Sequence, residues 1–185
     1  MQNLGSRILK TKRLTLRPFQ SSDAEVMYEN WAHDKEVTKY LTWTPHESLE
    51  ETRAICALWE EEAKRPTVYH WAIVYENELV GDITLGEVSS QETGHTGYCL
   101  MKKHWGKGIM TEAFQEVIRF AFEEVGLRRI EGMHAKENIG SAHVMRKCGL
   151  RKEGIKRDGY RLPSSGEWVD IVVRGILKED YLKKK

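Results

Sequence analysis

The sequence predicts an α+β fold, and three observations lead to this class. Its 185 residues are close to the usual size of one domain, so we expect a single domain over residues 1–185. Alternating apolar and polar residues, typical of strands, recur along the chain, and between these stretches the apolar residues follow helical spacing. The resulting order is one strand, two helices, a three-strand meander, a helix, a strand, a helix and two strands, which is an α+β arrangement.

The N-terminal part contains the first strand and two helices. Two leucines alternate with polar neighbours over residues 13–17 before a proline ends the run. Ser and Asp side chains at residues 21–23 can cap a helix whose apolar residues recur at helical spacing. Ser48 and Glu51 form a capping box, so a second helix runs from there to about residue 64.

The middle of the chain begins with the meander. Aromatic and β-branched residues over 69–75 and alternation over 79–85 predict a hairpin closed by a three-residue turn, and residues 96–101 can add a third strand. The apolar spacing then changes to that of a helix, which begins near residue 111 and stops at Gly126.

The C-terminal part adds a strand, a helix and two more strands. Residues 129–135 are typical of a strand, and Asn138 is a candidate cap for a helix over residues 139–148. Residues 151–160 and 168–177 predict the last two strands. The chain shows no internal repeat and no linker.

Composition and charge exclude several classes of protein. With 29 basic and 28 acidic residues the net charge is +1, so no large field attracts nucleic acid. No segment approaches the roughly 20 apolar residues of a membrane span, so we expect neither a nucleic-acid nor a membrane partner. Three widely spaced cysteines without a Cys-x-x-Cys pair predict reduced thiols in a cytoplasmic protein with no metal site.

Two glycines lie between the predicted strand that ends near residue 101 and the helix that begins near residue 111. Around Gly106 and Gly108, backbone N–H groups can converge without obstruction by a Cβ atom, and the helix N-terminus adds donors. Three lysines within residues 102–107 add positive charge. The segment matches neither the dinucleotide fingerprint nor the Walker loop, so it predicts a different pyrophosphate ligand, with an ordinary glycine turn as the alternative.

These residues resemble the GNAT family of acyl-CoA-dependent N-acetyltransferases. Residues 103–108, KHWGKG, are similar to the family's pyrophosphate loop Q/R-x-x-G-x-G/A, with lysine replacing the leading Gln or Arg. Residues 138–141 and 147–150 resemble a second family segment, N-x-x-S/A, and its closing turn. Residues 14–18, 40–43 and 97–98 resemble the RimJ/RimL branch, which acetylates protein N-termini, notably on ribosomal proteins.

The resemblance implies a GNAT-like fold, with a mixed and mostly antiparallel central sheet flanked by helices and splayed at the acyl-CoA site. The co-substrate is then acetyl-CoA, and its acetyl group passes directly to an amine without a metal. The pantetheine arm is expected to lie along the strand before the glycine loop. The residues expected to bind acetyl-CoA are Leu100, Met101, Lys102, Trp105, Gly106, Lys107, Gly108, Ile109, Met110, Asn138 and Ser141.

Two proton transfers define the expected catalytic residues. Many family members use a tyrosine seven residues after the asparagine to protonate the leaving thiolate, but Met145 occupies that position here. The resemblance leaves Ser141 as the acid, and a plain polar residue in the first turn of a capped helix is the equal alternative. Glu87 is the expected base toward the amine, with Glu167 as an alternative, and either can act through water. Further candidates for the base are His70 and His134.

The acceptor pocket is expected to contain Tyr40 and Trp43 as an aromatic wall, together with Glu167. The branch resemblance implies that the acceptor is the N-terminal α-amine of a protein such as a ribosomal protein. The alternatives are a small amine, namely a polyamine, an amino acid or an antibiotic, and a non-catalytic module that only binds acyl-CoA. An acidic pocket would favour polycationic amines. The sequence leaves open whether the protein is a monomer or a homodimer.

Overall fold

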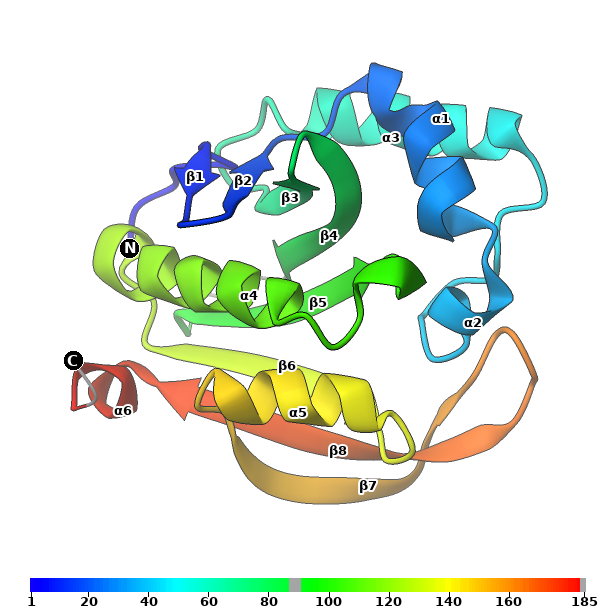
Figure 1. The fold of residues 1–185 in the computed structure, drawn as a ribbon. Helices are drawn as coiled ribbons and strands as arrows, with labels where there is room; N and C mark the ends of the chain where they lie inside the picture. The colour runs from blue at the N-terminus through cyan, green and yellow to red at the C-terminus, as the bar shows by residue number, and fades with distance from the viewer. Residues whose placement is uncertain (87–90, 184–185) are drawn as a thin grey trace.

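The computed structural model describes residues 1–86 and 91–183, and its strands form one sheet (Figure 1). The strands are β1 (Leu9–Lys10), β2 (Leu14–Arg17), β3 (His70–Tyr75), β4 (Glu78–Gly86), β5 (Thr93–Leu100), β6 (Arg129–Ala135), β7 (Arg151–Arg161) and β8 (Trp168–Leu177). They lie in the order β1-β2-β3-β4-β5-β6-β8-β7, and each neighbouring pair is antiparallel except β5 and β6, which are parallel. The predicted α+β class with a mostly antiparallel sheet is confirmed.

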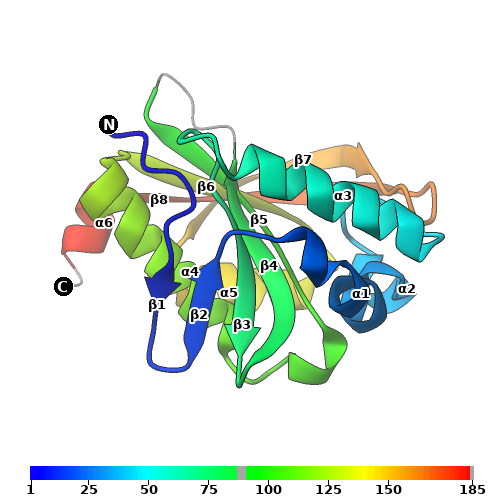
Figure 2. The same cartoon turned by 90° about the horizontal axis from the view of Figure 1, so that it is seen from above.

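Helices cover both faces of this sheet. The helices are α1 (Ala24–Met27), α2 (Lys35–Thr38), α3 (Leu49–Glu62), α4 (Ile109–Phe120), α5 (Ile139–Lys147) and α6 (Lys178–Leu182). One face carries α4 and α5, and the opposite face carries α1 and α3 (Figures 1 and 2). Within the described residues, no helix is long and apolar enough to cross a membrane.

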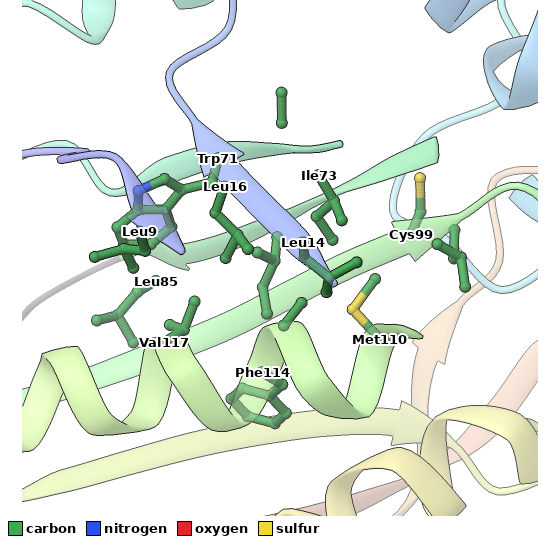
Figure 3. Packing of buried hydrophobic residues seen from close by; sticks show 14 of the residues in the cluster. Leu9, Leu14, Leu16, Trp71, Ile73, Leu85, Cys99, Met110, Phe114 and Val117 are labelled. Atoms are coloured by element: carbon green, nitrogen blue, oxygen red, sulfur yellow. The ribbon is translucent and has the colours of Figure 1, made fainter. Parts of the chain in front are cut away.

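A large part of the core lies between α4 and the sheet (Figure 3). Phe114 and Val117 of α4 face the sheet, where Leu14, Leu16 and Trp71 are also buried. Each such side chain stabilises the fold by about 1.5–3 kcal/mol on burial. This packing holds α4 against the sheet, and the glycine loop at the start of α4 is therefore held in place as well.

The strands β5 and β6 separate halfway along their length. Residues 93–96 pair with residues 129–132, whereas residues 97–100 pair only with β4. The last residues of β6 pair only with β8. The splayed sheet that the resemblance implies is therefore present, and it leaves a gap beside the second half of β5.

The hairpin between β3 and β4 has a shorter turn than predicted. Glu78 already pairs with Tyr75, so the turn contains only Glu76 and Asn77. Their φ angles are 50° and 64°, which is the left-handed conformation that a two-residue hairpin turn requires. The prediction of three residues was wrong because these two residues are not the glycines that usually mark such turns.

Strand β5 begins earlier than predicted, at Thr93. Gly94 interrupts the apolar alternation on which the prediction depended. A Cβ atom at Gly94 would lie 2.6 Å from Leu85 Cδ1 and 3.0 Å from Leu127 Cδ1. Neighbouring leucines thus fill the place of its side chain, so the strand carries no apolar signal there.

The first helical region is divided into short segments, whereas the sequence predicted one continuous helix. The helix expected to begin at residues 21–23 consists of a tight turn, α1 and a wider turn over Tyr28–Ala32. The helix α2 then follows, and the Asp34 carboxylate caps it by accepting hydrogen bonds from the N–H groups of Glu36 and Val37. Four residues show no helical periodicity, which is why the sequence did not predict α2.

Candidate active site

A pocket of about 730 Å³ lies where β5 and β6 separate. It is bordered by α2 and the residues after it, the second half of β5, the glycine loop with the start of α4, and α5. The predicted site residues that line it are Tyr40, Leu100, Trp105, Gly106, Gly108, Ile109, Met110, Asn138 and Ser141. The predicted site residues that the structure places outside the lining are Trp43, Met101, Lys102, Lys107 and Glu167.

The glycine loop holds two residues in the left-handed conformation. The φ angle is 76° at Gly106 and 75° at Gly108, a region that costs a residue with a side chain about 1–2 kcal/mol. A Cβ atom at Gly106 would meet no atom of the described chain within 4 Å, and at Gly108 it would meet only Arg13 Nη2, at 3.7 Å. Gly108 is the N-cap of α4, so no side chain at that position covers the first N–H groups of the helix. The two glycines leave open a cradle of backbone donors, which suits an anionic ligand.

The second half of β5 turns backbone groups toward the gap. Met101 N–H donates to the Val80 carbonyl of β4 at 2.8 Å, so the backbone of the alternate residues, Leu100 and Tyr98, points away from β4. The Leu100 carbonyl accepts a hydrogen bond from Trp105 Nε1–H at 2.7 Å. This edge lets an extended ligand with amide groups lie beside β5, and it places Met101 itself on the side of β4.

Ser141 lies in the first turn of α5, where two different contacts reach it. Asn138 Oδ1 accepts a hydrogen bond from Ser141 N–H at 3.1 Å and so caps the helix. Ser141 Oγ lies 2.9 Å from the hydroxyl oxygen of Tyr98, across the gap on β5. The cap therefore uses the backbone N–H of Ser141. The Ser141 hydroxyl takes no part in the cap and contacts Tyr98 instead.

Met145 takes the position of the tyrosine that the resemblance led us to look for. It is 2% exposed, and its Cε atom would lie 2.7 Å from a Cβ atom at Gly132 of β6. The side chain thus packs against the sheet and not into the pocket. Ser141 is the side chain of the same helix that lines the pocket and carries a hydroxyl.

Comparison with known proteins identifies the family of this chain. A family model described as Acetyltransferase (GNAT) domain matches residues 13–151, which is most of the chain. The chain belongs to the GNAT family. It is therefore an acetyl-CoA-dependent N-acetyltransferase.

The similarity to related proteins and solved structures covers nearly the whole of this GNAT chain. Uncharacterized N-acetyltransferase p20 of Bacillus licheniformis is 32% identical over 177 residues, which are 94% of this chain and 97% of that protein. Ribosomal protein uS5-alanine N-acetyltransferase of Escherichia coli K12 is 25% identical over 94% of this chain and 92% of its own. The crystal structure of a GNAT-family acetyltransferase from Bacillus anthracis superposes with a TM-score of 0.82 at 29% identity, covering 94% of this chain and 99% of that one.

The pocket of this acetyltransferase fits acetyl-CoA at two places. The open glycine cradle at the N-terminus of α4 suits the pyrophosphate, because backbone N–H groups and the helix dipole both favour negative charge there. The free edge of β5 suits the amide-bearing pantetheine arm. A ligand that occupied both would bring its thioester end toward α2 and Ser141, which border the same pocket.

A clamp of three residues steadies the glycine loop from the side of β2. Glu112, in the first turn of α4, accepts hydrogen bonds from Thr11 Oγ1 at 2.6 Å and Arg13 Nε at 2.6 Å. Arg13 Nη1 also donates to the Lys107 carbonyl at 3.3 Å. Burial raises the pKa of Glu112, but the Thr11 and Arg13 hydrogen bonds outweigh it and leave the pKa lowered. A carboxylate thus stays ionised beside the anion cradle, and Arg13 neutralises it.

Removing this neutralising charge is expected to weaken acetyl-CoA binding. Arg13→Ala leaves the Glu112 carboxylate uncompensated near the glycine cradle that suits the pyrophosphate, so we expect the KM for acetyl-CoA to rise about tenfold, or about 1.4 kcal/mol, with kcat unchanged. Steady-state thiol release at varied acetyl-CoA measures this, and adding Glu112→Gln should restore most of the affinity. The control is Arg53→Ala, because Arg53 forms an exposed pair with Glu25 on the other face. An unchanged KM in Arg13→Ala would contradict the role of the clamp.

Of the two glutamates expected as bases, the structure describes only Glu167. Glu87 lies outside the described residues and stays a prediction. Glu167 is exposed in the turn between β7 and β8, where its carboxylate accepts a hydrogen bond from Ser165 Oγ at 3.3 Å. In the same turn Ser164 Oγ donates to the Lys39 carbonyl at 3.0 Å. The turn is therefore hydrogen-bonded to Lys39, which lines the pocket, although Glu167 itself does not line it.

The two histidines considered as bases serve other contacts. His70 Nε2 lies 3.1 Å from Asp82 Oδ2. Burial, the main cause, and the Arg174 guanidinium lower the pKa of His134, which favours the neutral ring. A neutral ring fits the bonds observed, since Arg174 Nε donates to His134 Nε2 and His134 Nδ1 reaches the Ala135 carbonyl at 2.8 Å. Neither histidine lines the pocket.

The structure places one of the two aromatic residues predicted for the acceptor wall at the pocket. Tyr40 lines it, together with Glu36 and Lys39 of the α2 region. Trp43 instead packs against the core and against the His46 ring, with the ring centroids 5.0 Å apart. Of the two residues predicted for the aromatic wall, Tyr40 alone lines the pocket.

Several pocket residues were missed by reasoning from the sequence. On α5, Ile139, His143 and Lys147 line the pocket along one helix face. Their spacing of four residues was visible in the sequence and could have indicated this. Tyr98 belongs to a segment that resembles the RimJ/RimL branch, but that resemblance assigned it no role. For Glu36 no sequence signal exists, because only the folded chain brings α2 to the pocket.

Proposed function

We propose that this acetyltransferase acetylates the N-terminal α-amine of a protein, with acetyl-CoA as the donor. The observation that carries the proposal is the charge balance of the pocket. Among the described residues of its lining, the carboxylates of Glu36 and Glu137 are matched by the ammonium groups of Lys39 and Lys147. Glu36 is in addition ion-paired with Lys102. A pocket of this balance offers no net attraction to a polycation, which disfavours a polyamine acceptor.

The chemistry of the acceptor amine supports the same choice. An N-terminal α-amine has a pKa of about 7.7–8.0, whereas a lysine amine has a pKa of about 10.4. At neutral pH the fraction of uncharged amine is therefore about 300 times larger for the α-amine. Proton removal through water suffices for such an acceptor. The similarity to the uS5-alanine N-acetyltransferase supports the proposal as well.

We assign the roles within the pocket as follows. The pyrophosphate lies at Gly106 and Gly108, and the pantetheine arm lies along β5 at Leu100. The amine loses its proton to water, assisted by Glu87, and Ser141 gives a proton to the sulfur as the C–S bond breaks. We also propose that residues 1–185 form one acetyltransferase domain that works in the cytoplasm.

A peptide that carries both kinds of amine tests the acceptor. We expect a peptide with a free N-terminal alanine and an internal lysine to gain one acetyl group, at the α-amine, because that amine is the more often uncharged. Mass spectrometry with fragmentation locates the group. The control peptide has the same sequence with a blocked N-terminus and should remain unmodified.

Two outcomes would contradict the proposal. One is preferential acetylation of the lysine side chain in the peptide that carries both amines. The other is thiol release with free polyamines, amino acids or an antibiotic but with no peptide, which would favour the small-molecule alternative.

A further inference from the structure

We propose that Tyr98 is a positioning residue that holds the Ser141 hydroxyl as a proton donor to the leaving sulfur. This inference rests on the role of Ser141 in the proposed function and extends it to a residue of β5. Tyr98 and Ser141 both line the pocket, from opposite sides of the gap. They are 43 residues apart in the sequence, so the fold alone brings them together.

The contact between the two residues is double. The Tyr98 hydroxyl oxygen lies 2.9 Å from Ser141 Oγ and 3.2 Å from the Ser141 carbonyl oxygen. The tyrosine ring is supported from beneath by Phe114 of α4, with the ring centroids 5.8 Å apart. The hydroxyl of Tyr98 is therefore held at the first turn of α5 by a partly buried ring that packs against the core.

Each of the two hydroxyls has one hydrogen, so the pair can adopt two arrangements, and only the first makes both contacts as hydrogen bonds, since the second gives up the bond to the carbonyl. In the first, Tyr98 donates to the Ser141 carbonyl and accepts from Ser141 Oγ–H. In the second, Tyr98 donates to Ser141 Oγ, and the serine hydrogen is free to point into the pocket. The second arrangement prepares Ser141 for proton donation, because an oxygen that accepts a hydrogen bond releases its own proton more readily.

The protons balance in the second arrangement. When the C–S bond breaks, the Ser141 O–H bond also breaks and an S–H bond forms. The negative charge on Ser141 Oγ is then stabilised by the hydrogen bond that Tyr98 donates. Ser141 regains a proton from water, which has taken the proton lost by the attacking amine. The net change is the transfer of one proton from nitrogen to sulfur.

Burial keeps Tyr98 in the form that this role requires. Burial is the largest influence on the pKa of Tyr98 and raises it well above the usual value, while the Ser141 hydrogen bond and the Arg174 guanidinium oppose it. The phenol therefore remains protonated at neutral pH and acts as a donor. The charge of Arg174 also favours any negative charge that develops on this pair.

A double-mutant cycle tests the proposal. Tyr98→Phe keeps the ring and its packing on Phe114 but removes the hydroxyl, and we expect kcat to fall about tenfold with the KM for acetyl-CoA unchanged within about twofold. In a Ser141→Ala background the same change should alter kcat less than about twofold, because the group that Tyr98 serves is gone. Tyr160→Phe, on β7 and outside the pocket lining, is the matched control and should behave as wild type.

The cycle separates this inference from the proposed function. Turnover is followed as thiol release with any amine that the wild-type protein acetylates, so a different acceptor leaves the test intact. Melting temperatures with and without acetyl-CoA confirm that each variant folds and binds. Equal fold-losses from Tyr98→Phe in both backgrounds would overturn the inference, as would a wild-type kcat in Tyr98→Phe. A wild-type kcat in Ser141→Ala would overturn it together with the assignment of the acid.

Discussion

Replacing Gly108 by valine is expected to abolish the stabilisation that acetyl-CoA gives to this protein. Acetyl-CoA at 100 times its Kd should stabilise the wild type by about 2.7 kcal/mol and raise its Tm. The φ angle of 75° at Gly108 is strained for any residue with a side chain and most of all for a β-branched one. The protein itself leaves the Cβ direction open, so the new side chain would enter the space that we propose for the pyrophosphate.

The measurement is a thermal shift titration with acetyl-CoA, supported by direct binding. Gly154→Val is the matched control, because a Cβ atom there also meets no atom of the described chain within 4 Å and its φ is not in the left-handed region. The control should lose little stability and keep the full ligand shift. Wild-type affinity in Gly108→Val would show that the glycine loop is not the pyrophosphate site.

Ser141→Ala is expected to lower kcat by about 100-fold, within the usual range for loss of a general acid. Affinity for acetyl-CoA should change little, because the hydroxyl acts only as the sulfur leaves. The melting temperature should also change little. The helix cap is made by Ser141 N–H and Asn138 Oδ1, and alanine keeps that N–H group.

A capping variant separates the two roles that the sequence left open for Ser141. Asn138→Ala removes the acceptor of the cap and should cost about 1 kcal/mol of stability. Ser141→Ala should show the reverse pattern, with a loss of rate and no comparable loss of stability. If Ser141→Ala lowers only the melting temperature and leaves kcat unchanged, the serine is a structural residue and the acid lies elsewhere.

The parts of the site that the sequence predicted are those with local signals. Gly106 and Gly108 mark a loop because glycine tolerates positive φ, and Asn138 marks a helix start because its side chain reaches an N–H group three residues on. Such preferences act within a few residues, so they are visible before the chain folds. The prediction of a three-residue turn after β3 was wrong because this local signal is missing there. Glu76 and Asn77 have positive φ, but neither is a glycine that would indicate it.

Contacts between distant segments required the tertiary structure. Arg13 meets Glu112 across 99 residues, and α2 reaches the pocket although its four residues carry no periodic signal. The sequence predicted Trp43 in the acceptor wall, but its indole packs against the core, whereas Tyr40 lines the pocket. Whether an aromatic side chain packs in the core or faces a ligand depends on the neighbours that the fold supplies.

The sequence by itself determined the α+β class, the family resemblance, the glycine loop and the cap of α5. Each depends on side-chain periodicity or on backbone preferences of adjacent residues. Only the tertiary structure decided that β5 and β6 part after residue 96, that Arg13 balances Glu112, and that Tyr98 meets Ser141. Charge compensation and hydrogen bonding act over a few ångströms, and the packing of α4 and α5 on the sheet is what brings these residues within that range.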